Sequence, residues 1–182
     1  MNYLFTAAGR GTRFLKEGIK PPKPLIKVLG NELLIWSMDS FNFIEGDKIF
    51  IVSFSKHHVK ERLYKKIHLK YPGISVNWLE IDQILEGQLL TAREAVIYFN
   101  IKGPLLIHNC DTFYKFDSLE INSLLLNNNY FGIIPCFKAE GNHWSFVKTN
   151  LLDDTLAEEV KEKERISNNC TVGTYIFSNS DE

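Results

Sequence analysis

A short segment that is both glycine-rich and basic follows the first apolar run of the chain. The run ends in AAGRGTR, where Gly9 and Gly11 flank Arg10 and are followed by Thr12 and Arg13. Glycines let backbone N–H groups approach an anion closely, and an arginine can hold a phosphate by two parallel hydrogen bonds. These residue types at this spacing indicate a phosphate-binding loop.

The basic character is confined to one part of the chain. The net charge is −1, yet residues 1–30 contain six lysines or arginines and a single acid, Glu17. One of these lysines, Lys23, lies in a proline-stiffened segment, PPKP, that can deliver a second point charge to the same anion. A nucleic-acid-binding domain would have a pI well above the value of 6.5 found here. We therefore expect a local site for a small anion and no nucleic-acid partner.

Two common phosphate-binding designs do not fit the segment. A Walker loop needs a glycine, four residues and then Gly-Lys-Ser/Thr, but counting from Gly9 the second glycine is replaced by Phe14. A dinucleotide fingerprint needs a glycine at that same position, a helix that opens at once, and an acid after the second strand, where Ser53 stands. With these two designs excluded, we expect a basic phosphate-binding loop of another kind.

The elements that must position this loop follow from hydrophobic periodicity. Short apolar runs predict strands at Asn2–Ala8, Lys48–Phe54, Ile74–Ile81, Pro104–Cys110, Phe131–Phe137, Trp144–Thr149 and Thr171–Phe177. Helical spacing predicts helices at Asn31–Phe43, Ser55–Lys70, Gly87–Phe99 and Ser118–Asn127. The alternation predicts one α/β domain, residues 1–182, with a mainly parallel, mixed sheet flanked by helices. Ligands bind such a sheet at the carboxyl ends of its strands, which is where the basic loop lies.

Composition argues against a membrane or secreted protein and against a metal site built from cysteines. The chain has no apolar run long enough to span a membrane and no secretory leader pattern, so we expect a cytoplasmic protein without a membrane partner. The three cysteines lack metal-type spacing and are expected to be buried thiols. They are Cys110, Cys136 and Cys170. The histidines are scattered, and we assign none of them a catalytic or ligand role. They are His57, His58, His68, His108 and His143.

Several stretches together resemble one enzyme family. AAGRGTRF followed by PPKPLIKVLGNELLIW resembles the signature of the nucleotidyltransferases that include the sugar-phosphate nucleotidyltransferases, or nucleoside-diphosphate-sugar pyrophosphorylases. EGQLLTA, IHNCDT and EVKEKERIS with TVGTYIF match further family segments in the same order. GNHWSFVKTN is similar to a subgroup from bacterial capsule and surface-polysaccharide loci. The resemblance spans the whole chain and implies a Rossmann-like domain of the GT-A type.

The resemblance also implies roles for individual residues. The nucleotide would be bound by Ala7, Ala8, Gly9, Arg10, Gly11, Thr12, Arg13, Lys23, Gln83, Gly87, Gln88 and Asn109. Among these, Arg13 and Lys23 would be catalytic, because they stabilise the charge that grows on the pyrophosphate leaving group. Asp111 would ligate the Mg²⁺ cofactor. Glu162 and Lys163 would bind the acceptor.

The implied reaction is the transfer of a nucleoside monophosphate from a nucleoside triphosphate to a phosphorylated acceptor, with release of pyrophosphate. By resemblance the nucleotide is a pyrimidine, CTP, UTP or dTTP, and the acceptor is a sugar 1-phosphate used in surface-polysaccharide precursor synthesis. A cytidylyltransferase acting on a non-sugar phosphate stays open as an alternative. The leading variant is phosphoglutamine, with a CDP-linked product, as in capsular phosphoramidate synthesis.

The chain departs from the family pattern at its end. Family members generally continue further, and a second acid commonly follows the strand that matches Thr171–Phe177. Here Asp181 or Glu182 could stand in that place, or a C-terminal segment is lacking. The departure bears on the metal site, on acceptor binding and on the expected homo-oligomer.

Two alternatives from other classes stay open. A glycosyltransferase of the GT-A type would use a similar sheet, but it typically carries Asp-x-Asp where this chain has NCDT with its single acid. A nucleotide-binding domain without catalytic activity is the second alternative. Release of pyrophosphate distinguishes both from a nucleotidyltransferase.

Overall fold

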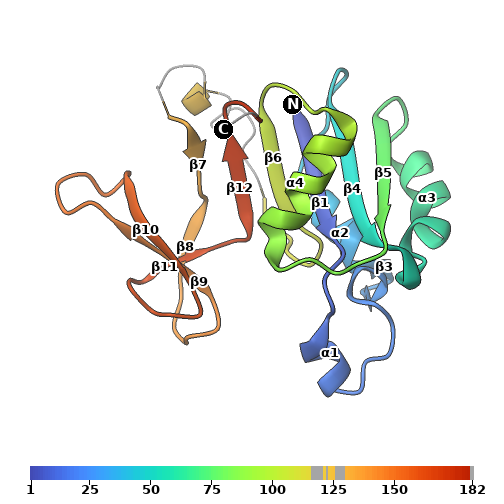
Figure 1. The fold of residues 1–182 in the computed structure, drawn as a ribbon, viewed down its shortest axis with the longest axis horizontal. Coiled ribbons are helices and arrows are strands. Elements are labelled where there is room, and N and C mark those ends of the chain that lie inside the picture. The colour runs from blue at the N-terminus through green and yellow to red at the C-terminus, as the bar shows by residue number, and fades with distance from the viewer. Residues whose placement is uncertain (116–120, 122, 126–129, 181–182) are drawn as a thin grey trace.

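The structure is a computed structural model that describes residues 1–115, 121, 123–125 and 130–180. Its main sheet has the strand order β5-β4-β1-β6-β12-β7 (Figure 1). The strands are β1 (Asn2–Ala7), β4 (Lys48–Phe54), β5 (Ser75–Ile81), β6 (Leu105–Asn109), β7 (Gly132–Ile133) and β12 (Thr174–Phe177). Strands β1, β4, β5 and β6 run parallel, and β12 is antiparallel to both β6 and β7. The predicted mixed, mainly parallel α/β sheet is therefore confirmed.

Helices cover both faces of the main sheet. Helices α2 (Leu33–Met38) and α3 (Val59–Lys70) pack against one hydrophobic cluster, which includes Phe5. Helix α4 (Gly87–Phe99) packs against the other cluster, which includes the neighbouring Leu4 (Figure 1). Successive side chains of a strand point to opposite faces, so a strand between two helical layers must be apolar at every position. This explains the continuous apolar runs in the sequence.

A second sheet lies beside β12 and β7 (Figure 1). Its strands are β8 (Cys136–Lys138), β9 (Ser145–Thr149), β10 (Ala157–Glu162) and β11 (Asn169–Thr171), all antiparallel, in the order β10-β9-β11-β8. The chain crosses between the two sheets twice, from β7 to β8 and from β11 to β12. We refer to this four-stranded unit, residues 136–171, as the small sheet.

Two predicted strands are wrong because each one crosses between the sheets. Phe131–Phe137 is divided into β7 and β8 around Pro135, which has no N–H to donate to a ladder. Thr171–Phe177 is divided into β11 and β12 at Gly173, whose φ of 77° is left-handed. Strand β10 is a further difference, because its charged sequence gave no strand signal.

Two predicted helices also differ in extent. The Asn31–Phe43 helix is shortened to α2, because Asn31–Glu32 forms strand β3 and pairs with β2 (Lys27–Val28). In Ser55–Lys70, a left-handed His58 separates a 3-10 turn from α3. Ser118–Asn127 lies largely outside the described residues, although residues 121 and 123–125 are helical.

The remaining helical elements are short or match the prediction. The predicted helix Gly87–Phe99 is confirmed as α4, with the same bounds. A five-residue helix, α1 (Thr12–Lys16), opens directly after the glycine-rich loop, and a 3-10 turn, η1 (Lys23–Leu25), follows it. Within the described part of the chain, no helix is long and apolar enough to span a bilayer.

Candidate active site

A cleft of about 1670 Å³ lies between the main sheet and the small sheet. Its walls come from the loop after β1, the start of α4, the segment after β6, and strands β9 and β10. It therefore opens at the carboxyl ends of the central parallel strands β1 and β6, the position expected for a ligand in an open α/β sheet.

Most of the residues singled out in the sequence line this cleft. Those present are Gly9, Gly11, Thr12, Arg13, Lys23, Gly87, Gln88, Asn109, Asp111, Glu162 and Lys163. Four others do not line it. Ala7 and Ala8 are buried beneath the loop, and Arg10 and Gln83 are exposed outside the lining. Gln88 donates from Nε2 to the carbonyl of Gly173 at 3.1 Å, which joins α4 to the crossing between the sheets.

The basic loop is shaped by a left-handed glycine. Gly11 has a φ of 65° and directly precedes α1. A Cβ at this position would lie 3.3 Å from the Cβ of Lys23, a close contact for a side-chain carbon. Glycine thus provides both the backbone conformation and the room for the lysine segment. The loop and Lys23 form one continuous basic wall, to which Arg13 also contributes.

Lys23 forms an ion pair with the carboxylate at the end of β6. Its Nζ lies 2.7 Å from Oδ2 of Asp111, and each side chain is 25% exposed. Buried Leu25 and Pro24 anchor the turn that carries the lysine. A pair at this level of exposure remains accessible to competing ions. A phosphate would attract the ammonium group and a cation the carboxylate.

The opposite wall of the cleft is formed by the small sheet. Lys163 follows β10 and has a φ of 58°, which is uncommon for a residue with a side chain. Its backbone N–H donates to the carbonyl of Trp144 at 2.8 Å, which fixes the position of the residue. The Nζ lies 2.7 Å from Oε1 of Glu162, and both side chains are more than half exposed. The predicted acceptor residues therefore face the basic wall across an open cleft.

Two groups near Asp111 had no predicted structural role. His108 is fully buried, and burial lowers its pKa to about 4, against the opposing effects of a hydrogen bond to Thr112 and of the charge on Asp111. Gly173 packs so tightly on Asn109 that a Cβ there would lie 2.1 Å from Nδ2. The histidine within an apolar strand was visible in the sequence, whereas one of its two partners, Thr174, comes from a distant segment.

The residues after β6 offer oxygen ligands of the kind that Mg²⁺ prefers. Asp111 supplies a carboxylate, and the buried Oδ1 of Asn109 has no hydrogen-bond partner among the described residues. No cluster of three His, Cys, Asp or Glu suited to a metal occurs in the described ranges. Mg²⁺ usually takes one or two carboxylates, with phosphate oxygens and water completing its shell. Asp111 therefore fits a magnesium ion that arrives with a phosphate ligand.

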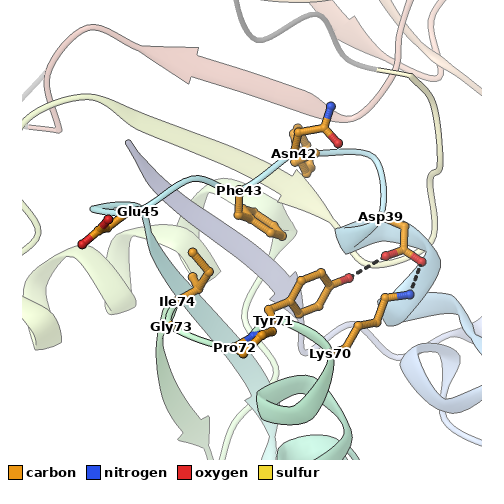
Figure 2. A pocket seen from close by; sticks show the side chains of 10 residues that line it. Asp39, Asn42, Phe43, Glu45, Lys70, Tyr71, Pro72, Gly73 and Ile74 are labelled. Atoms are coloured by element: carbon orange, nitrogen blue, oxygen red, sulfur yellow. Dashed lines mark hydrogen bonds and ion pairs between the residues drawn. The ribbon is translucent and has the colours of Figure 1, made fainter.

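A second cavity, of about 730 Å³, lies away from these residues (Figure 2). Its lining includes Asp39, Phe43, Lys70, Tyr71 and Ile74. The carboxylate of Asp39 accepts from Nζ of Lys70 at 2.6 Å and from the hydroxyl of Tyr71 at 2.7 Å. Because these polar groups are paired with one another, we place the chemistry in the larger cleft.

Comparisons with known proteins bear on the fold. No family model matches the chain, and no curated protein matches it. A solved nucleoside-diphosphate-sugar pyrophosphorylase from Vibrio cholerae aligns with a TM-score of 0.81 at 23% identity, covering 100% of this chain and 74% of that one. The inositol-1-phosphate CTP transferase from T. maritima aligns at 0.74 and 16% identity, covering 97% and 70%. The chain shares their fold.

A third solved structure extends this comparison. A UDP-glucose pyrophosphorylase complexed with UDP-glucose aligns with a TM-score of 0.67 at 19% identity, covering 97% of this chain and 75% of that one. All three alignments include nearly the whole of this chain, so both the main sheet and the small sheet belong to the shared architecture.

Proposed function

We propose that this protein is a nucleotidyltransferase that moves a nucleoside monophosphate from a nucleoside triphosphate to a phosphorylated acceptor. One observation carries the proposal. A single cleft joins a basic, glycine-rich wall and a strand-end carboxylate on one side to Glu162 and Lys163 on the other. Such a cleft can hold two phosphorylated molecules next to each other. The names of the solved structures with the same fold support this choice of reaction.

The residues of the chain would act by position and charge. Arg13 and Lys23 hold the triphosphate and compensate the charge that develops on the departing pyrophosphate. Lys163 holds the phosphate of the acceptor, whose oxygen attacks the α-phosphorus in line, so no covalent enzyme intermediate is needed. Asp111 and Asn109 would hold Mg²⁺, which when bound neutralises phosphate charge. Lys23 leaves Asp111 as the triphosphate enters.

We further propose a pyrimidine nucleotide and a sugar 1-phosphate or a similar small phosphate as substrates. Two similar structures are described as a CTP transferase for inositol 1-phosphate and as a complex with UDP-glucose, which supports this choice. The exposed acceptor wall, with Trp144 beside Ser145, Glu162 and Lys163, suits a small polar molecule. We also propose a role in surface-polysaccharide precursor synthesis, on the resemblance of GNHWSFVKTN to the subgroup from such loci.

The deciding experiment measures pyrophosphate release. The protein is incubated with Mg²⁺ and each of CTP, UTP, dTTP, ATP and GTP, against glucose 1-phosphate, inositol 1-phosphate and phosphoglutamine. We expect release with a pyrimidine triphosphate only when an acceptor is present. Release of nucleoside diphosphate from a nucleotide sugar, without pyrophosphate, would instead identify a glycosyltransferase.

A matched pair of variants tests the basic wall. Arg13 lines the cleft, whereas Lys20 is an exposed cation of the same segment outside the lining. Arg13→Ala should lower turnover by about a hundredfold, by analogy with the loss of other donors that stabilise transition-state charge. Lys20→Ala should keep wild-type turnover, and both variants should keep the wild-type melting temperature. Equal turnover in the two variants would contradict the assignment.

A further inference from the structure

A buried hydrogen-bonded chain lies directly behind Asp111. His108 on β6 and Thr174 on β12 are register partners, and both are fully buried. The imidazole Nδ1 lies 2.7 Å from Oγ1 of Thr174, and Nε2 lies 3.0 Å from the carbonyl oxygen of Thr112. The hydroxyl of Tyr114 donates to the same Thr174 oxygen at 3.1 Å. The ring thus bonds directly to Thr174 and to the Thr112 carbonyl, and is linked to Tyr114 through Thr174.

The chemistry of these groups fixes the direction of the hydrogen bonds. A carbonyl oxygen only accepts, so Nε2 of His108 must carry the proton that is donated to Thr112. The other ring nitrogen, Nδ1, then accepts from the Thr174 hydroxyl, whose oxygen accepts from Tyr114. Donation runs one way, from Tyr114 through Thr174 and His108 to the Thr112 carbonyl, with the imidazole neutral.

The hydrogen bonds around His108 anchor the backbone that follows Asp111, and a second set of hydrogen bonds anchors the backbone that precedes it. The carbonyl of Asn109 accepts from Oγ of Ser37 at 2.6 Å. The N–H of Asn109 donates to the carbonyl of Gly173 at 3.2 Å. The intervening Cys110 side chain is buried. Asp111 therefore stands between two fixed peptide groups while its carboxylate faces the cleft.

We propose that His108 is a positioning residue for Asp111, holding the Thr112 carbonyl so that the carboxylate enters the cleft in one direction. The proposal rests on the function proposed above, in which Asp111 holds the cation that accompanies the triphosphate. The role needs no change in the protonation of His108. It requires only a rigid donor at Nε2, a tautomer that the Thr112 carbonyl fixes and that the Thr174 hydroxyl matches by donating to Nδ1. Residues that orient ligands through such bonds typically affect metal affinity or activity by about 10–100-fold.

Two substitutions separate the hydrogen bond from the packing of the ring. The ring of His108 packs edge-on against those of Phe5 and Phe41, at centroid distances of 6.0 and 5.0 Å. His108→Phe keeps an aromatic ring there but removes the donor to Thr112. His108→Gln can place an amide N–H near the position of Nε2 and so restore that donor.

We expect His108→Phe to raise the half-saturating Mg²⁺ concentration about tenfold and to lower kcat by about 10–100-fold. His108→Gln should bring both the half-saturating Mg²⁺ concentration and kcat most of the way back to their wild-type values. Where His108→Phe does not fold, Thr174→Val gives the second test, because it removes the hydroxyl that donates to Nδ1 and helps to hold the ring in place. Thr174→Val should shift the Mg²⁺ requirement in the same direction by a smaller factor.

Tyr71→Phe is the matched control. It removes a single hydroxyl that donates to Asp39 in the second cavity (Figure 2), whose lining shares no residue with the cleft. The loss of one buried hydrogen bond should lower its melting temperature and leave its Mg²⁺ requirement unchanged. A fall in kcat that merely followed the melting temperature in both variants would make His108 a structural residue and overturn the proposal.

Amide exchange gives a readout that does not depend on activity. The N–H of Tyr114 donates to Oγ of Ser40 at 3.2 Å, so its exchange reports how firmly the segment after Asp111 is held. Exchange at Tyr114 should accelerate at least tenfold in His108→Phe and stay at the wild-type rate in Tyr71→Phe. Unchanged exchange in His108→Phe overturns the positioning role. A wild-type protein that releases no pyrophosphate overturns the proposed function instead, and the exchange rates then decide whether His108 holds the segment.

Discussion

The two walls of the cleft are built on different kinds of sheet. Five of the six residues of β1 are buried, and β6, which leads to Asp111, is almost entirely buried as well. In the small sheet, none of the six residues of β10 is buried. The basic wall is therefore carried by strands buried between two layers of helices, whereas Glu162 and Lys163 of the acceptor wall lie on or beside an edge strand that is largely open to water.

Polar contacts add to the packing of the few buried apolar side chains in the small sheet, such as Phe146 and Val147. The guanidinium of Arg165 donates to the carbonyls of Ala139 and Gly141 at 3.0 and 2.7 Å and to Oδ1 of Asn168 at 2.8 Å. It also lies 4.9 Å from the ring centroid of Phe146. One arginine thus joins several segments of the sheet. Under the proposed function, we expect substitutions on the basic wall to affect the chemistry and those on the acceptor wall to affect the affinity for one substrate.

The largest effect is expected on the basic wall, from Asp111→Asn. The substitution keeps the shape of the side chain but removes the charge that pairs with Lys23 and would hold Mg²⁺. We expect turnover to fall by more than about a hundredfold, and excess Mg²⁺ to restore part of it. Pyrophosphate release and calorimetric Mg²⁺ affinity measure the two effects.

Asp153→Asn, in the β9–β10 hairpin, is the control for that prediction. Asp153 also has a local role, since its Oδ1 accepts from the N–H of Thr155 at 2.9 Å, but it does not line the cleft. This variant should keep both turnover and Mg²⁺ affinity. If Asp111 only capped the following turn, Asn would serve as well as Asp, and Asp111→Asn would also be active.

A smaller and more selective effect is expected on the acceptor wall, from Lys163→Ala. The lost ammonium would touch only the acceptor phosphate, so acceptor affinity should fall by about 10–100-fold while nucleotide affinity is unchanged. Calorimetric titration with a triphosphate, and then with acceptor in the presence of a non-reacting nucleotide, measures the two affinities separately.

Lys161→Ala is the matched control on the same strand. Lys161 pairs with Glu159 and Glu164 at 3.6 and 3.5 Å and does not line the cleft. Its removal should change neither affinity, because exposed ion pairs contribute little. Should Lys163→Ala reduce both affinities, or behave like Lys161→Ala, the division of the cleft into two half-sites is wrong.

The contrast between the buried main sheet and the more exposed small sheet also explains how much of the fold could be predicted from the sequence. Strands β1, β4 and β6 and helix α4 were predicted closely, because a buried parallel strand is a local apolar run and a helix has a local period. In the small sheet only β9 was predicted closely, from the run Trp144–Thr149. The edge strand β10 has a charged sequence, and the two crossings looked like continuous strands because both sides of each break are apolar.

The candidate site also contains one part that the sequence could predict and one part that it could not. The basic loop could be predicted from its residues alone, because glycines and cations adjacent in sequence act together. The 2.7 Å pairing of Lys23 with Asp111 depends on two segments far apart in the chain. Only the family resemblance connected those two residues. Nothing local marked the pairing of His108 with Thr174, since it follows from β12 lying antiparallel to β6.

The smallest expected effect concerns ion pairs in the two regions. Glu32 is buried, and its Oε2 lies 2.6 Å from Nζ of Lys66, which joins β3 to α3. Burial raises the pKa of Glu32, but the hydrogen bond and charge of Lys66, with the charge of Lys27, outweigh it, so the pKa is lowered from its ordinary 4.5. In the small sheet, Glu158 and Lys148 lie 3.6 Å apart and are both substantially exposed.

Glu32→Gln should therefore lower the free energy of unfolding by about 1–2 kcal/mol at neutral pH, and Glu158→Gln by less than about 0.5 kcal/mol. Because the pKa of Glu32 is lower in the folded than in the unfolded chain, its contribution is fully present above about pH 4.5 and is lost as the pH falls through the folded value. Urea unfolding at neutral and acidic pH should show wild type and Glu32→Gln converging in acid. Equal losses in the two variants, or a gap independent of pH, would mean that the buried Glu32 ion pair contributes no more than the exposed Glu158 pair.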